Sequence, residues 1–231
     1  MISLGVLLLV GLAQVGPLPE TGFSPIFDGK SLSKWDCDPD FWRVEGGAMI
    51  GETTADHQSK QNIFCIYKGS SPADFELRLQ YRLTGAQTGN SGIQYRSEEL
   101  PSVAKWVLKG YQLDIDAAQR YTGQLYEERG RAFVALRGQI VSVPDGGKPG
   151  AIGSLGDGVE LKSAIKLEDW NEVTILARGN TLVHIFNGRV MCVTIDDDKA
   201  NRKMSGELGI QLHKTTGPMK IEVRNIRLKT F

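Results

Sequence analysis

Apolar and polar residues alternate along most of this chain, and a period of two marks β-strands rather than helices. The clearest run spans 74–83, where the apolar positions are Phe75, Leu77, Leu79, Tyr81 and Leu83. One face of this strand is therefore expected to pack on a core and the other, which is charged, to meet solvent. No long stretch follows the helical period of 3.6, so the pattern predicts an all-β protein.

Turn residues divide the chain into short strands. Gly46-Gly47 and Asn187-Gly188 each separate two alternating runs, and Asn-Gly in this setting is the strongest short-range signal for a β-hairpin. Many short strands joined by Gly, Asn and Asp turns predict a β-sandwich or jelly roll. Strands placed in this way are 41–45, 48–50, 170–177, 181–186, 189–195, 207–213 and 220–229.

The most informative polar residues also recur at strand spacing. Gln112, Asp114 and Asp116 alternate with apolar residues, so they share one face of a strand. Gln94 and Arg96 alternate in the same way just upstream. Two carboxylates and an arginine are thus expected on one sheet face. The alternative is an ordinary solvated face of an antiparallel sheet, where such alternation is common.

Other polar residues near these strands indicate a concave site of sugar size. Asn90 flanks the upstream strand, and Tyr126 and Glu127 follow the downstream one. Gln211 and His213 share a face of a later strand, which makes them further candidates for a set of convergent polar groups.

Several other features are interpreted structurally. His184 lies between apolar residues and is expected in the core. Cys37, Cys65 and Cys192 permit at most one disulfide; we expect buried free thiols, and their spacing excludes an obvious zinc site. The three aspartates at 196–198 are expected to form a solvated turn, with a calcium site as the alternative.

Two kinds of anion binding are excluded. The chain has 27 basic and 27 acidic residues among 231, so it lacks the basic surplus of a nucleic-acid-binding protein. The Gly- and Pro-rich segment 143–158 is not a phosphate loop, because Pro149 follows Lys148 and no helix-forming stretch comes after it. We expect a flexible surface loop there, at the rim of the site.

The first residues have the character of an export signal. Residues 2–13 form an apolar run shorter than the about 20 residues that span a bilayer, and Ala13 and Gly16 offer a cleavage point. We interpret 1–20 as a secretory signal and linker, and 21–231 as one domain, because all-β domains often reach this size undivided. The mature protein is expected in the periplasm or outside the cell, without a membrane span.

Short motifs follow one another in a fixed order over about 23–228, nearly the whole mature chain. They are Phe27-Asp28-Gly29-Lys30-Ser31-Leu32-Ser33-Lys34-Trp35, Trp42-Arg43-Val44-Glu45-Gly46-Gly47, Asp74-Phe75-Glu76-Leu77, Asn90-Ser91-Gly92-Ile93, Thr122-Gly123, Trp170-Asn171, Asn187-Gly188, Gly209-Ile210-Gln211-Leu212-His213 and Arg224-Asn225-Ile226. This ordered set resembles the 3-keto-disaccharide hydrolase domain family. The resemblance implies a concanavalin A-like jelly-roll sandwich in a secreted bacterial protein that acts on oxidised sugars.

The resemblance also implies partners and a catalytic strand. A sugar 3-dehydrogenase would supply the ketone, and no metal ligand is assigned, although a divalent metal is compatible. Many members carry Glu-x-Gln where this chain has Gln112-Leu113-Asp114. Asp114 and Asp116 are therefore the candidates for carboxylates at or beside that place.

The chemistry of such a substrate defines what the site must hold. In a 3-keto-glycoside the C2 hydrogen is acidic, and the aglycone on C1 lies β to the carbonyl. A base removes the proton, the aglycone leaves from the enolate, and hydration of the enone completes a net hydrolysis. Our hypothesis makes Asp114 or Asp116 the base, Arg96 the enolate stabiliser and His213 a contact of the leaving group. Substrate contacts are assigned to Asn90, Gln94, Gln112, Tyr126, Glu127 and Gln211.

Three alternatives stay open. A direct glycosidase would use two carboxylates at a defined separation on the same fold. A non-catalytic carbohydrate-binding module would use the same polar groups, with Trp106 and Tyr121 as stacking candidates. A metal-stabilised structural domain has only 196–198 in its favour. The paired carboxylates beside Arg96 favour an enzyme that cleaves 3-keto-glycosides, as hydrolase or lyase.

Overall fold

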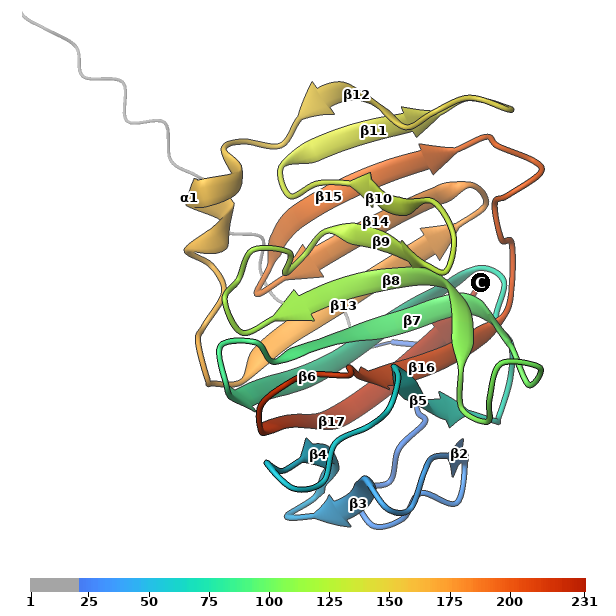
Figure 1. The fold of residues 1–231 in the computed structure, drawn as a ribbon. Helices are drawn as coiled ribbons and strands as arrows, with labels where there is room; N and C mark the ends of the chain where they lie inside the picture. Colours follow the sequence, from blue (N-terminus) through green and yellow to red (C-terminus); the bar gives the residue numbers. More distant parts are fainter. Residues whose placement is uncertain (1–20) are drawn as a thin grey trace, which may run out of the picture.

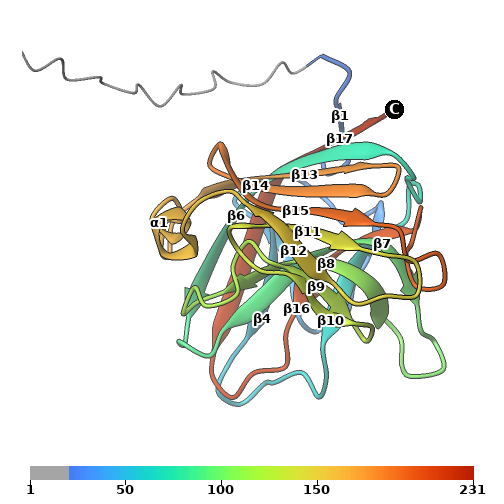
Figure 2. The ribbon, with the colours of Figure 1, turned by 90° about the horizontal axis from the view of Figure 1, so that it is seen from above.

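Two sheets pack face to face and bury apolar side chains from most of their strands between them (Figures 1 and 2). This computed structural model describes residues 21–231, so the predicted signal and linker at 1–20 lie outside the described residues. The only helix in the described part is α1, Gly158–Lys162. Its N-cap is Asp157, whose side chain accepts hydrogen bonds from the backbone N–H groups of Val159 and Glu160. The predicted all-β jelly-roll class is confirmed.

The larger sheet has ten strands in the order β12-β11-β15-β14-β13-β6-β17-β4-β3, with β1 paired to β17. Its pairs are antiparallel except for β11 with β15. The strands are β1 (Ser24–Pro25), β3 (Trp42–Glu45), β4 (Ala48–Thr53), β6 (Phe75–Gly85), β11 (Gln139–Val143), β12 (Gly150–Ser154), β13 (Asn171–Arg178), β14 (Thr181–Phe186), β15 (Arg189–Asp196) and β17 (Met219–Thr230).

The smaller sheet has seven strands in the order β10-β9-β8-β7-β16-β5-β2 and faces the viewer in Figure 1. Because its inner side packs on the larger sheet, its outer side is the face that can carry a site. The strands are β2 (Trp35–Asp36), β5 (Ile63–Tyr67), β7 (Asn90–Glu99), β8 (Leu108–Asp116), β9 (Leu125–Glu128), β10 (Ala132–Ala135) and β16 (Glu207–Leu212).

Alternating apolar side chains form the core, as the sequence predicts. The apolar positions of β6 are buried, and from the opposite sheet Ile93, Tyr95, Leu113 and Ile115 meet the same core. Each such side chain contributes about 1.5–3 kcal/mol by leaving water, so this layer is the main source of stability. His184 is buried as expected, with its Nε2 2.8 Å from the hydroxyl of Tyr95.

The Gly- and Pro-rich segment differs from the prediction. Instead of a plain loop, β11 and β12 form an antiparallel pair at one edge of the larger sheet. The side chains of β12, in Gly150–Ser154, are exposed throughout. This strand pairs with β11 through its backbone while its side chains face solvent, so it carries no alternating pattern that sequence reasoning could detect.

The expectation of three free thiols was wrong. Cys37 and Cys65 form a disulfide, with their Cα atoms 4.2 Å apart, and Cys192 is the buried free cysteine. The two paired cysteines are 28 residues apart and meet because β2 pairs with β5. This proximity is a product of strand pairing, which the sequence spacing did not reveal.

The solvated-turn interpretation of the aspartates was wrong at two of the three positions. Asp196 and Asp198 are buried, and the guanidinium of Arg131 lies between them, with Nη2 2.5 Å from Oδ2 of Asp196. Arg131 also pairs with Glu127, and Tyr111 donates a hydrogen bond to Asp196. Within residues 21–231, no group of three His, Cys, Asp or Glu side chains is arranged to hold a metal ion.

Among residues 21–231, no helix is long and apolar enough to cross a membrane bilayer.

Replacing Arg131 by Met is expected to destabilise the fold by about 3–5 kcal/mol, because Glu127 and Asp196 would remain buried without their counter-charge. The control is Arg189→Met, whose exposed pair with Glu160 should contribute less than about 1 kcal/mol. Urea denaturation at pH 7 measures both. Equal effects of the two substitutions would show that the buried network is not structural.

Candidate functional site

A row of polar side chains crosses β7 and β8 on the outer face of the smaller sheet. Ile93 and Leu113 point into the core, so their neighbours Gln94, Gln112 and Asp114 point outward. The amide of Gln94 donates to Gln112 at 3.2 Å, and the amide of Gln112 donates to Asp114 at 2.8 Å. One directed chain of hydrogen bonds thus ends on a carboxylate.

Glycine makes this row possible at Gly92. A Cβ there would lie 2.4 Å from Cδ of Gln112, so the Gln112 side chain occupies the space that any other residue would fill. Gly92 is also the register partner of Asp114. The site therefore depends on a missing side chain as well as on those present.

Burial rules out the ordinary solvated face. Gln94 is 0% exposed, Gln112 2% and Asp114 5%, whereas a wet sheet face would leave such residues open to water. Buried polar groups are costly unless they are hydrogen-bonded, and the chain of bonds described above meets that need.

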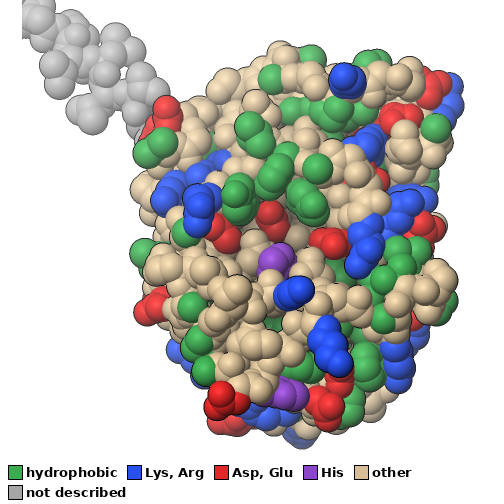
Figure 3. Space-filling view, in the orientation of Figure 1, with side chains coloured by type: hydrophobic (Ala, Val, Ile, Leu, Met, Phe, Trp, Pro, Cys, Tyr) green, Lys and Arg blue, Asp and Glu red, His purple; other side chains and the backbone are tan. Residues whose placement is uncertain are grey.

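Glu128 supplies a second carboxylate on the same face. In β9, Tyr126 pairs with Gln112 and Glu128 pairs with Gly110, so both point outward while Leu125 enters the core. The Glu128 carboxylate accepts hydrogen bonds from the side chain of Asn62 at 3.4 Å and from that of Gln211 at 3.3 Å. Figure 3 shows acidic and histidine side chains gathered near the middle of this face.

Burial shifts the pKa of each titratable group here toward its neutral form. It raises the pKa of Asp114 to about 7; the hydrogen bond from Gln112 opposes this rise, and the charges of Asp116 and Glu128 add to it. Burial likewise raises the pKa of Glu128 and lowers that of His213. Asp114 is therefore poised to gain or lose a proton near neutral pH.

Two atoms on this face have spare hydrogen-bonding capacity. Among the described residues, Oε1 of Gln211 and Nδ1 of His213 are buried without a hydrogen-bond partner. Gln211 belongs to β16, and His213 follows that strand at the same alternation. Both are positioned by the strand that the sequence predicted, and both can bond a ligand's hydroxyl groups.

Arg96 does not lie on this face. The β7–β8 register shifts at a bulge after Tyr95, and Arg96 has a φ of 46°, so its side chain turns away from the alternation. Its guanidinium donates to the carbonyls of Ala73 and Gly179, at 2.9 and 2.7 Å from Nε and Nη1, and pairs with Asp74. The residue is 1% exposed and holds loops together.

Glu127 and Asp116 are likewise engaged elsewhere. Glu127 points inward to Arg131, because it alternates with the outward Tyr126 and Glu128. Asp116 accepts hydrogen bonds from backbone N–H groups of the loop that follows β8, including that of Tyr121 at 2.8 Å. Its partner across the sheet is Asn90, the first residue of β7.

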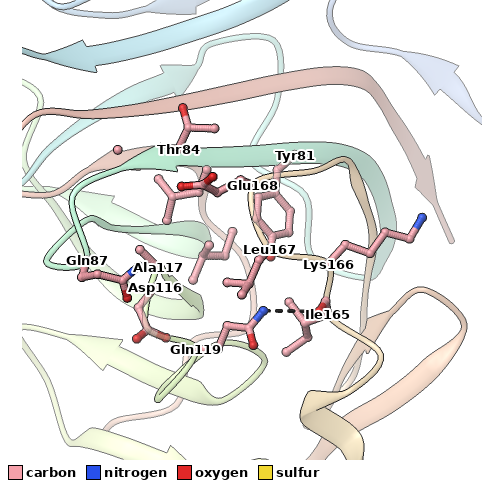
Figure 4. A pocket seen from close by; sticks show the side chains of 13 residues that line it. Tyr81, Thr84, Gln87, Asp116, Ala117, Gln119, Ile165, Lys166, Leu167 and Glu168 are labelled. Carbon is pink, nitrogen blue, oxygen red and sulfur yellow. Dashed lines mark hydrogen bonds between the residues drawn. The ribbon is translucent and has the colours of Figure 1, made fainter.

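Asp116 also lines a separate cavity of about 240 Å³ at one end of the sandwich (Figure 4). Tyr81 and Gln119 line it with Asp116, and neither Asp114 nor Glu128 does. Sequence reasoning therefore placed Asp114 on the outer face, as the structure does, and did not single out Glu128. Tyr126 and Glu128 are two residues apart, so they share one face of a strand. Because Tyr126 is the partner of Gln112 in the β8–β9 register, Glu128 lies on the face that carries Gln112.

Comparison with known proteins decides the family. The model of the 3-keto-alpha-glucoside-1,2-lyase-like domain matches residues 22–229. This chain belongs to that family. A 3-keto-disaccharide hydrolase of Bacteroides thetaiotaomicron is 25% identical over 187 residues, which cover 73% of this chain and 57% of that protein. The chain thus spans little more than half the length of this relative.

Solved structures share the fold of this family member. A Parabacteroides distasonis protein named as a candidate glycosyl hydrolase is 16% identical to this chain. The match covers 90% of this chain and 99% of that protein, with a TM-score of 0.58. A carbohydrate-binding module of Bacillus subtilis is 14% identical, covering 91% and 96%, with a TM-score of 0.52. At these identities the likeness shows the sandwich fold alone.

Asp114→Asn is expected to change how stability depends on pH. The folded pKa of about 7 exceeds the unfolded value of about 3.9, so the native state binds more protons between these values and loses stability as pH rises through them. The variant lacks this loss, which amounts to about 1.4 kcal/mol for each pH unit that separates the two pKa values. Urea denaturation from pH 4 to 8 should show that the free energy of unfolding of the variant rises relative to that of the wild type as pH increases. Parallel curves would contradict a raised pKa.

Proposed function

We propose that this domain cleaves 3-keto-glycosides by removing the C2 proton and eliminating the C1 aglycone. The observation that carries the proposal is Asp114, a buried carboxylate with a pKa of about 7, on one face with a second carboxylate, Glu128. A general base works best when its pKa lies near the working pH. Membership of the 3-keto-alpha-glucoside-1,2-lyase-like family supports the same chemistry.

In the proposed reaction, the ionised Asp114 accepts the C2 proton. The electron pair of the C2–H bond forms an enolate with the C3 carbonyl, and its collapse expels the aglycone oxygen from C1. Water then adds its hydroxyl to C1 and a proton to C2 of the enone, which gives net hydrolysis. Without that addition the product is the enone, and the reaction is a lyase reaction.

Glu128 is proposed as the acid for the leaving oxygen, because burial raises its pKa and favours its protonated form. Oε1 of Gln211 can accept from a sugar hydroxyl, and neutral His213 can donate to the enolate oxygen or accept from a hydroxyl. In this assignment His213 takes the role of enolate stabiliser that the sequence hypothesis gave to Arg96, because Arg96 is buried away from the face. Asp116 is proposed to hold the loop that carries Tyr121.

Export and an upstream oxidation belong to this proposal. The Cys37–Cys65 disulfide supports an oxidising compartment such as the periplasm or the exterior, where disulfides persist. The substrate's ketone requires an oxidoreductase that acts on the C3 hydroxyl beforehand. A second candidate function is sugar binding without turnover, which the exposed aromatic residues Tyr121 and Phe133 beside the polar face favour.

Incubation with a 3-keto-glucoside and with the matching unoxidised glucoside tests the proposal, with aglycone release as the readout. We expect release from the keto substrate alone, because only its C2 hydrogen is acidic. A parallel incubation with chelator determines whether a divalent metal takes part. Binding of both substrates without release would support the sugar-binding function instead.

Asp114→Asn is expected to lower kcat/KM for the keto substrate by at least about a hundredfold, the usual contribution of a general base. In the wild type, kcat/KM should rise with pH through about 7, since the base must be ionised. The control Glu45→Gln, exposed on β3 of the other sheet, should leave kcat/KM unchanged. Full activity of Asp114→Asn would remove Asp114 from the mechanism.

A further inference from the structure

Three aromatic side chains adjoin the polar row, and we call them the aromatic platform: Tyr121, Tyr126 and Phe133. Tyr126 pairs with Gln112 on one side and with Phe133 on the other, so Tyr126 and Phe133 continue the row on the outer face. The rings of Tyr126 and Phe133 meet edge to face, with centroids 5.1 Å apart. Tyr121 stacks on Phe133 at 5.2 Å and an interplanar angle of 29°.

The platform exposes apolar surface next to buried carboxylates. Tyr121 is 38% exposed and Phe133 39%. Single exposed apolar residues are normal, but mutually packed ones beside a polar site mark a binding surface. Figure 3 shows hydrophobic side chains grouped directly beside the acidic ones on this face.

Tyr126 links the platform electrostatically to the carboxylates. Burial raises the pKa of its hydroxyl, and the charges of Glu128 and Asp114 raise it further. Tyr126 lies opposite Gln112 in the β8–β9 register, diagonal to Asp114, and it shares its strand face with Glu128. A ligand atom that contacts Asp114 and Glu128 therefore has Tyr126, and then Phe133, as its next neighbours toward β10.

The loop that carries Tyr121 is held in place. Asp116 accepts hydrogen bonds from the N–H groups of Tyr121 and Thr122 and from the Thr122 hydroxyl at 3.0 Å. A stacking surface held in this way loses little conformational entropy when a ring binds. Asp116 is thus a positioning residue for the platform.

We propose that the platform is the subsite for the leaving group and that it takes a planar aromatic aglycone. This inference rests on the proposed function. The exposed faces of Tyr121 and Phe133 offer ring surface, and a flat aromatic group makes more stacking contact with such surface than a puckered sugar ring does.

The test compares three substrates of the full chain: phenyl 3-keto-glucoside, methyl 3-keto-glucoside and a 3-keto-glucosyl disaccharide. Phe133→Ala is expected to lower kcat/KM for the phenyl substrate roughly three- to tenfold, mainly through KM, because a stacking contact is lost. For the methyl substrate the same variant should stay within about twofold of the wild type. Tyr121→Ala should act in the same direction, and Phe133→Tyr should restore the phenyl rate.

Phe231→Ala serves as the matched control, since Phe231 is an exposed aromatic that follows β17 in the other sheet. Equal losses on the phenyl and methyl substrates would overturn the platform's role, and a loss largest for the disaccharide would assign the subsite to a sugar ring. If the wild type cleaves none of the three, the proposed function fails. In that case, calorimetry with phenyl and methyl 3-keto-glucoside tests separately whether the platform binds an aromatic group. If Phe133→Ala weakens binding of the phenyl compound alone, the platform's role is supported. Any other result overturns that role.

Discussion

The burial of Leu113 and Ile115 between the two sheets determines which face carries the candidate site. Because a strand alternates sides at every residue, placing these two in the core forces Gln112 and Asp114 outward. The same rule applied to Leu125 and Ile210 sends Tyr126, Glu128 and Gln211 to the same face. A slip of one residue would exchange the two sets and destroy core and site together.

The site is maintained at a cost in stability. Desolvation raises the pKa of Asp114 to about 7 and raises that of Glu128, so each carboxylate is less stable in its charged form than it would be in water. The large apolar layer offsets this penalty. In the network around Arg131 the charged forms are stabilised instead, because three carboxylates share one guanidinium. These ion pairs contribute to the stability of the fold. Buried acids thus lie in two different electrostatic settings on the two sides of one sheet.

Sequence reasoning failed where the backbone departs from regular alternation or where side chains carry no pattern. Arg96 alternates with Gln94 along the chain, but a bulge and a positive φ turn it inward. β12 pairs with β11 through its backbone, and its side chains are exposed. Its exposed side chains therefore gave no alternation to read.

The sequence by itself determined the all-β class, the hairpins, the family and the outward position of Asp114, Gln112 and Gln94. Each of these follows from local periodicity, turn chemistry or the order of motifs along the chain. Only the tertiary structure decided that Glu128 joins Asn62 and Gln211, that Cys37 meets Cys65, and that Tyr121 stacks on Phe133. These contacts join separate strands and loops, and they depend on strand order and register, which the period of two does not specify.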